Sequence, residues 1–246
     1  VYIWDMDETL ILLKSLLNGT YAEAFNGLKD VQKGIEIGKR WEDYILQVCD
    51  KFFFYEQIED YNEPFLDALN EYDDGLDLSD YDFSKDCFDD PNKRKLAYRH
   101  RIIGEKYSQG LHNFLDQDMI KLWDELYHLT DSYTDGWLSS ARAFLEQQNI
   151  NVLVTSGSLI PSLVKCLLFR LDRLIVYSSW EVGKHQCFSW IKERYLSVRF
   201  CVIGDGIEEC NAAQAMKWPF IRIDPHPHRF PGLTMKTLNC YQEVVY

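Results

Sequence analysis

Two aspartates, Asp5 and Asp7, lie one residue apart directly after the first apolar run of the sequence, residues 1–4. A third carboxylate, Asp205, follows a later apolar run and stands between two glycines. Carboxylate oxygens are the protein ligands that Mg²⁺ prefers, together with water and a phosphate oxygen. If both runs are strands of one sheet, these side chains share a pocket. The sequence therefore predicts a magnesium site.

Two hydroxyls and a lysine complete this candidate site. Thr155 and Ser156 follow another apolar run, and Lys184 precedes the run that ends at Asp205. A hydroxyl and an ammonium group can neutralise the charge that a cation leaves on a phosphoryl group. These residue types in this order indicate phosphoryl transfer.

The two N-terminal aspartates can divide the chemistry between them. A carboxylate with an unperturbed pKa of ~3.9 is ionised at neutral pH, so Asp5 is predicted to attack phosphorus and form an aspartyl phosphate. Asp7 is predicted to donate a proton to the departing oxygen and then to take one from the hydrolytic water. Asp5 is the expected nucleophile and Asp7 the expected general acid and base.

Five apolar runs are predicted to position these residues as buried parallel strands. They are residues 1–4, 151–155, 173–179, 199–205 and 219–223. The segments between the later runs have the apolar spacing of helices. Strands that alternate with helices predict an α/β fold with a doubly wound parallel sheet, whose ligand crevice lies beyond the carboxyl ends of the strands.

Residues 13–130 interrupt this alternation. They contain three stretches with helical spacing, 41–54, 93–107 and 118–129, and a loop rich in Asp, Gly and Ser at 73–90. We therefore predict a helical cap inserted after the first strand. The expected division is a catalytic core of residues 1–12 and 131–246 and a cap of residues 13–130.

The net charge of −13 resides in one segment, because residues 56–90 hold fourteen acids and one base while the rest of the chain balances. A nucleic-acid-binding domain should instead carry a basic surface, so direct nucleic-acid binding is not expected. The acidic segment is interpreted as a solvated loop or as a docking surface for basic partners. The basic run 93–101 beside it is a candidate for contact with substrate phosphate or an acidic peptide.

Two further features restrict the class of protein. No stretch approaches the ~18 apolar residues of a membrane span, and the first residues do not resemble a signal peptide, so we expect a soluble protein without a membrane partner. The seven cysteines form no C-x-x-C pair, which argues against a disulfide framework or a zinc ribbon. We expect a reducing compartment and cysteines that pack in the core.

The order of these motifs resembles the haloacid dehalogenase (HAD) superfamily of aspartate-based phosphatases. That pattern is D-x-D-x-T after a first strand, Ser or Thr after the second, a lysine before the fourth, and G-D-G followed by acids. More narrowly, the chain looks like the catalytic domain of the Eyes absent family. The collinear segments that carry this likeness are W-D-M-D-E-T, L-L-N-G-T-Y, V-L-V-T, L-I-P-S-L-V-K, V-G-K-x-x-C-F, V-I-G-D-G-x-E-E and P-F-x-R-I.

This resemblance implies a HAD-like, Rossmann-like core and a magnesium-dependent protein tyrosine phosphatase that uses aspartate instead of cysteine. The nucleophile is then Asp5, and the acid/base is Asp7, whose main-chain carbonyl also binds the metal. Asp205 completes the metal site. The implied phosphoryl ligands are Thr155 and Lys184, with Ser156 as a further candidate because animal members carry a threonine run after V-L-V-T. The residue expected to orient metal-bound water is Glu208 or Glu209.

The resemblance also implies partners. We expect a phosphotyrosine protein or peptide as substrate, a cytoplasmic or nuclear location, and a short form that lacks the N-terminal transactivation region of the family. Family members pair with Six homeodomain transcription factors, so a transcription factor is a candidate partner. Two alternatives stay open: a HAD phosphatase of small molecules, and an interaction module for a transcription factor whose phosphatase site is vestigial.

Overall fold

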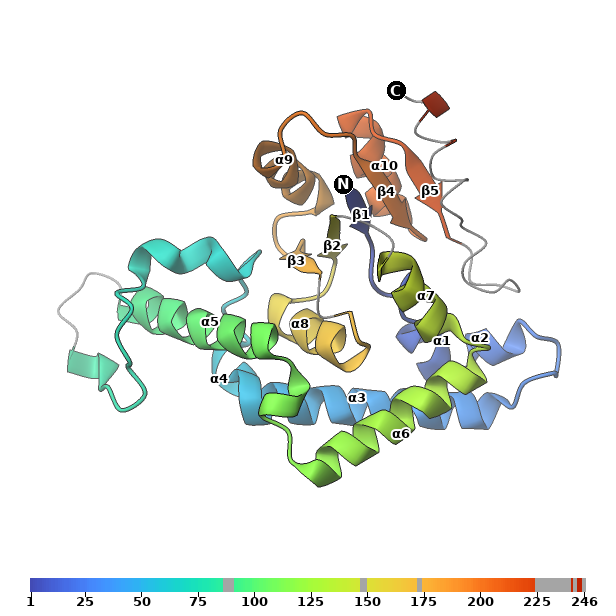
Figure 1. Cartoon of the computed structure of the whole chain (residues 1–246), viewed down its shortest axis with the longest axis horizontal. Helices are drawn as coiled ribbons and strands as arrows, with labels where there is room; N and C mark the ends of the chain where they lie inside the picture. The colour runs from blue at the N-terminus through green and yellow to red at the C-terminus, as the bar shows by residue number, and fades with distance from the viewer. Residues whose placement is uncertain (86–90, 147–149, 172–173, 224–239, 241–242, 245–246) are drawn as a thin grey trace.

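A computed structural model of the chain describes residues 1–85, 91–146, 150–171, 174–223, 240 and 243–244. It contains a five-stranded, entirely parallel sheet in the order β3-β2-β1-β4-β5 (Figure 1). The strands are β1 (Tyr2–Trp4), β2 (Asn151–Thr155), β3 (Ile175–Ser178), β4 (Cys201–Gly204) and β5 (Phe220–Arg222). All five predicted apolar runs are therefore strands, and the predicted doubly wound α/β fold is confirmed.

Helices cover both faces of this sheet because successive strand residues point to opposite sides. On one face Trp4, Leu153 and Ile203 pack against α7 (Trp137–Glu146) and α8 (Leu159–Leu168). On the other face Ile3, Val152 and Val202 pack against α9 (Lys184–Arg194) and α10 (Ile207–Met216). The sheet is thus buried on both sides, which is why its strands read as continuous apolar runs.

The described residues between β1 and α7 are helical and turn segments. The α-helices are α1 (Leu13–Leu17), α2 (Thr20–Glu23), α3 (Val31–Phe53), α4 (Tyr55–Ile58), α5 (Pro91–Gln109) and α6 (Gln117–Tyr133). Short 3₁₀ helices follow at η1 (Leu66–Tyr72), η2 (Phe83–Lys85) and η3 (Leu111–Asn113). In Figure 1, α3 and α6 cross below the sheet and α5 extends to the left.

The first of the three predicted helical stretches, 41–54, is too short, since α3 begins at Val31. Its start is fixed by Asp30, whose carboxylate accepts the Lys33 backbone N–H at 3.1 Å. This N-cap satisfies one of the backbone donors that the first turn of a helix leaves free. The other two stretches lie within α5 and α6.

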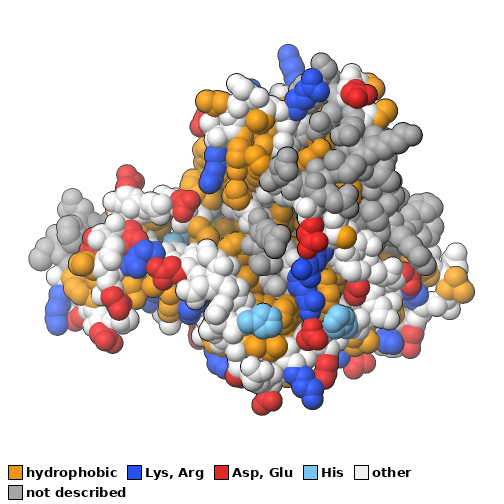
Figure 2. Space-filling view, in the orientation of Figure 1, with side chains coloured by type: hydrophobic (Ala, Val, Ile, Leu, Met, Phe, Trp, Pro, Cys, Tyr) orange, Lys and Arg blue, Asp and Glu red, His pale blue; other side chains and the backbone are white. Residues whose placement is uncertain are grey.

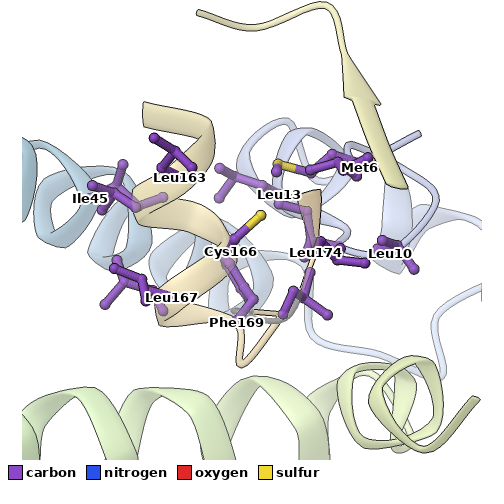
Figure 3. Close-up of a cluster of buried hydrophobic side chains, with 14 of the residues drawn as sticks. Met6, Leu10, Leu13, Ile45, Leu163, Cys166, Leu167, Phe169 and Leu174 are labelled. Atoms are coloured by element: carbon purple, nitrogen blue, oxygen red, sulfur yellow. The ribbon is translucent and has the colours of Figure 1, made fainter. Parts of the chain in front are cut away.

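One hydrophobic core joins these helices to the sheet layer. Figure 3 shows side chains from four parts of the chain, α8 among them, gathered in one cluster. They are Met6, Leu10 and Leu13 after β1, Ile45 of α3, Leu163, Cys166 and Leu167 of α8, and Phe169 and Leu174 before β3. This cluster includes side chains from both the predicted core and the predicted cap of residues 13–130. The division into these two parts stays a prediction.

Acidic and basic side chains are intermixed on the surface at the end of the molecule where α5 lies (Figure 2). Arg94 pairs with Asp74 at 2.6 Å and Arg101 with Asp73 at 2.8 Å. These two arginines of the predicted basic run are therefore bound to the acidic segment of the same chain. Residues 86–90 of that segment, with Cys87, lie outside the described residues.

Of the described cysteines, Cys49, Cys166, Cys187 and Cys201 are buried as predicted, whereas Cys210 of α10 is half-buried and Cys240 is exposed. Among the described helices, none combines the length and the apolar character that a membrane crossing requires.

Candidate active site

The carboxyl ends of three neighbouring strands bring the predicted site residues to one edge of the sheet. Asp5 follows β1, Thr155 ends β2 and Asp205 follows β4. β1 pairs with both other strands, and the Asp5 backbone N–H donates to the Ile203 carbonyl at 2.9 Å. The direction of strand succession reverses at β1, where α/β sheets form their ligand crevice. Residues that are far apart in sequence therefore meet here.

Three carboxylates form the centre of this site. One carboxylate oxygen from each of Asp5, Asp205 and Glu209 lies within 4.8 Å of the others. The Asp205 carboxylate also accepts from the Thr9 hydroxyl at 3.4 Å, which links the last residue of D-x-D-x-T to the third acid. This set contains only hard oxygen ligands, and it fits a Mg²⁺ ion. The Asp7 side chain is not part of the cluster.

The ammonium of Lys184 lies between two of these carboxylates. Its Nζ donates to Asp5 Oδ1 at 2.6 Å and to Glu209 Oε2 at 2.7 Å, and all three residues are buried. Lys184 is the first residue of α9, directly after Gly183, whose φ of 79° is in the region that favours glycine. A buried charge is tolerated only when it is paired, and here the lysine is paired twice.

Burial changes the protonation of the predicted nucleophile. Removal from water raises the pKa of Asp5 to about 7, although the Lys184 charge acts in the opposite direction. Without a cation, burial therefore opposes the ionisation that the unperturbed pKa predicts for this carboxyl. Burial and the Glu209 charge raise the pKa of Asp205 as well. A divalent cation beside both groups favours their ionised forms.

The sequence left open which of Glu208 and Glu209 belongs to the site, and the structure places the two side chains differently. Glu209 is buried, pairs with Lys184, and accepts the backbone N–H of Gly206. Burial acts to raise the pKa of Glu209, but the Lys184 charge acts against it and the pKa is lowered. A Cβ at Gly204 would lie 2.6 Å from Glu209 Oε1, so glycine is required there. Glu208 is exposed and accepts from the Ser156 hydroxyl at 3.4 Å.

The two candidate hydroxyls, those of Thr155 and Ser156, also differ in burial. Thr155 is buried at the end of β2, and its Oγ1 accepts the Gly157 N–H at 3.2 Å. Ser156 is exposed and points to Glu208. Thr155 therefore belongs to the buried edge of the sheet, and Ser156 to the rim.

A contact that the sequence reasoning missed holds the side chain of Asp7. Lys165 of α8 donates from Nζ to both carboxylate oxygens of Asp7, at 3.0 and 3.1 Å. The available signal was a lysine within the apolar helix of L-I-P-S-L-V-K, where a buried charge needs a partner. Lys165 orients the carboxyl that was predicted to exchange protons.

Comparison with known proteins gives the relatives of the chain. None of the protein-family models that were compared matches the sequence. Protein phosphatase EYA of Arabidopsis thaliana is 61% identical over 277 aligned positions, which cover 100% of this chain and 90% of that protein. Human protein phosphatase EYA2 is 33% identical over 92% of this chain, and protein phosphatase eya of Drosophila melanogaster is 34% identical over 92%. The chain spans 47% of the human and 34% of the fly protein.

Proposed function

This chain belongs to the Eyes absent family of protein phosphatases, and on that premise we propose that it hydrolyses phosphotyrosine in proteins or peptides with Mg²⁺ and an aspartyl-phosphate intermediate. The observation that carries the proposal is the cluster of Asp5, Asp205 and Glu209 with Lys184 at the edge of the sheet. It combines a carboxylate nucleophile, oxygen ligands for a cation and a buried ammonium.

The metal ligands in this proposal are Asp5, Asp205 and the main-chain carbonyl of Asp7, with Glu209 orienting water beside them. A bound Mg²⁺ supplies charge neutralisation at the phosphoryl oxygens. The Lys184 ammonium, already 2.6 Å from Asp5, adds positive charge on the same side. Thr155 donates its hydroxyl to a phosphoryl oxygen.

The reaction proceeds in two displacements. A carboxylate oxygen of Asp5 attacks phosphorus, the bond from phosphorus to the tyrosine oxygen breaks, and Asp7 gives that oxygen a proton. Asp7 then takes a proton from water, whose oxygen attacks the phosphorus of the aspartyl phosphate. Inorganic phosphate leaves and the Asp5 carboxylate is restored.

Because the leaving group is a phenol, we expect the loss of Asp5 to reduce activity more than the loss of Asp7. A phenol has a pKa of ~10, so its oxygen needs less help from a proton donor than an alkyl oxygen does. We expect Asp5→Asn to lower kcat by a factor of about 10⁴ or more, since the nucleophile is lost. Asp7→Asn should retain more activity towards aryl phosphates than towards alkyl phosphates.

The proposal is tested with a phosphopeptide panel. Matched peptides that carry phosphotyrosine, phosphoserine or phosphothreonine are incubated with the chain in Mg²⁺ and in EDTA, and phosphate release is measured. We expect Mg²⁺-dependent release from phosphotyrosine alone. Asp5→Asn protein, purified in parallel, controls for contaminating phosphatases. Undiminished turnover in EDTA or by Asp5→Asn contradicts the mechanism.

The same panel separates the two alternatives. Small phosphorylated metabolites that are hydrolysed far better than any peptide indicate a small-molecule phosphatase. Binding of a transcription factor by a chain that turns over no phosphate ester indicates an interaction module. The cytoplasmic or nuclear location and the transcription-factor partner stay predictions.

A further inference from the structure

An open pocket of about 850 Å³ lies beside Lys184, outside the carboxylate cluster. One wall is the turn between β3 and α9, and the other is formed by α10 and the residue after β2. The lining residues that matter here are Ser156, Trp180, Glu181, Val182, Lys184 and Glu208. Since Lys184 binds the nucleophile at 2.6 Å, the pocket opens next to the site of chemistry.

The most unusual feature of this pocket is an exposed tryptophan. Trp180 leaves 66% of its surface in water, and the neighbouring Val182 leaves 39%. Burial of such a side chain is favourable, so an exposed indole beside the candidate active site is suited to contact with a ligand.

The turn that carries Trp180 is fixed by hydrogen bonds on both sides. Before it, the Ser179 N–H donates to the Thr155 carbonyl at 2.8 Å, which ties the turn to the end of β2. After it, the Gly183 N–H donates to the Ser179 carbonyl at 2.9 Å. The backbone of Trp180 itself donates to the Ser178 hydroxyl at 3.4 Å. The ring is thus presented from a constrained loop.

Two carboxylates line the same pocket as this ring. Glu181 and Glu208 are exposed in the pocket wall, and the Ser156 hydroxyl holds Glu208 at 3.4 Å. Lys184 already forms ion pairs with Asp5 and Glu209. The other basic side chain among the lining residues is His185. The accessible surface is therefore aromatic and acidic.

We propose that this pocket binds an arginine or lysine side chain of the substrate, close in sequence to the phosphorylated residue, with its cation on the face of Trp180 and between Glu181 and Glu208. The inference rests on the proposed function, since it assigns a specificity subsite to the same reaction. Arginine suits the pocket better than lysine, because the guanidinium stacks on an indole and pairs with carboxylates in a planar geometry.

The charge of the pocket argues against its other occupant, the phosphorylated ring itself. A neutral ring gains nothing from neighbouring carboxylates, and they repel the phosphate dianion that it carries. A cationic side chain is attracted by both the ring and the acids.

The test compares phosphotyrosine peptides that carry arginine or its uncharged analogue citrulline, placed in turn at each position within three residues of the phosphotyrosine. The chain is expected to prefer arginine at one position by about tenfold in kcat/KM, the equivalent of ~1.4 kcal/mol of cation–π and ionic contact. Trp180→Ala and Glu181→Gln should each reduce this ratio to about twofold or less. The exposed Leu196→Ala and Glu193→Gln on the same side of the sheet are matched controls that should keep it.

Equal turnover of arginine and citrulline peptides at every position overturns the subsite while the proposed function stands. If Trp180→Ala slows all peptides and p-nitrophenyl phosphate by one factor and leaves the ratio intact, the ring contacts the phosphorylated residue, which also overturns it. If the unaltered chain hydrolyses no phosphate ester, the proposed function fails. Calorimetric binding of the same peptides with a phosphonate in place of phosphate then decides the subsite alone, by the presence or absence of the arginine preference.

Discussion

At the scale of single residues, the ammonium of Lys184 lies among three carboxylates at the candidate site. Lys184 contacts Asp5 and Glu209 directly, and Asp205 lies beside them. Two opposing effects raise and lower the pKa of Lys184: burial lowers it, and the two carboxylates raise it, with a net increase. The lysine is therefore a structural counter-ion as well as a proposed phosphoryl ligand.

We expect Lys184→Met to lower the free energy of unfolding by about 3 kcal/mol or more in EDTA, since it leaves buried carboxylates without their partner. Added Mg²⁺ should restore part of the loss, because a ligand that binds only the folded state stabilises it. Urea unfolding with and without Mg²⁺ measures both effects. Lys192→Met, at an exposed position of the same helix, is the control. Equal stability of the two variants in EDTA contradicts this role.

A second buried titratable residue, His100 of α5, lies away from the site. The residue is 3% exposed, its Nδ1 has no hydrogen-bond partner among the described residues, and burial lowers its pKa. As the pH falls through about 6.5, His100 therefore binds a proton in the unfolded chain but not yet in the folded chain. Stability from this residue is present above about pH 6.5 and is lost as the pH falls below it, at no more than ~1.4 kcal/mol per pH unit.

We expect His100→Gln to remove this contribution to the pH dependence of unfolding between about pH 7 and pH 5. The free energy of unfolding is measured in urea across that range. His112→Gln, at an exposed histidine, should retain the slope of the unaltered chain. A slope for His100→Gln that equals that of the control refutes the assignment.

Asp5, Thr155 and Asp205 could be singled out from the sequence because strand ends can be located from apolar runs, and Lys184 was singled out by its order before the run that ends at Asp205. The sequence did not separate Glu208 from Glu209, because adjacent residues of a helix point about 100° apart and only the packing of α10 decides which faces inward. The contact between Lys165 and Asp7 joins residues 158 positions apart and depends on the angle of α8. Such contacts follow from tertiary packing and not from local pattern.

At the scale of elements, α1 and α3 approach so closely that their contact requires glycine. A Cβ at Gly38 would lie 2.8 Å from the backbone nitrogen of Leu17, and one at Gly34 would meet the Tyr133 hydroxyl at 2.6 Å. Both glycines lie in the first half of α3, where they weaken the helical pattern. This explains why sequence reasoning found only the second half of the helix.

We expect Gly38→Ala to destabilise the fold by about 1–3 kcal/mol, since the clash is with backbone and forces the two helices apart. Gly104→Ala in α5 is the matched substitution, because its Cβ meets only Leu66 Cδ1 at 3.8 Å. That change should stabilise by roughly 0.5–1 kcal/mol through helix propensity. Thermal unfolding of the pair gives opposite shifts of Tm, and shifts of one sign would disprove the close approach.

The other helices between β1 and β2 were predicted unevenly, for a related reason. The helices α1, α2 and α4 have four or five residues, which is too short for an apolar period to be visible. Short helices are marginal on their own and form here because tertiary contacts hold them.

At the scale of the whole molecule, the sheet and the helices before it form one core. Trp41 of α3 packs on Phe169 with ring centroids 4.3 Å apart, and its indole N–H donates to the Thr130 hydroxyl of α6 at 2.7 Å. Trp4 of β1 packs on Phe144 of α7 at 5.5 Å. Of these contacts, the one between Trp41 and Phe169 joins the predicted cap to the sheet layer.

We therefore expect one cooperative unfolding transition. Tryptophan fluorescence, far-ultraviolet circular dichroism and proteolytic sensitivity should give the same urea midpoint. Trp41→Phe, which removes the indole N–H in α3, should move the midpoint of all three signals together. Separate transitions for residues 13–130 and for the remainder would instead support an independent cap domain.

The central place of β1 in the sheet affects how this enzyme is made. Its two neighbouring strands begin at Asn151 and Cys201, and 179 residues separate Asp5 from Lys184. A ribosome therefore releases Asp5 long before Lys184 and Asp205 are synthesised. Asp5 therefore lacks its paired lysine until synthesis has passed the start of α9. A chain interrupted before residue 184 carries the proposed nucleophile without the ammonium and the acids that surround it in the folded molecule.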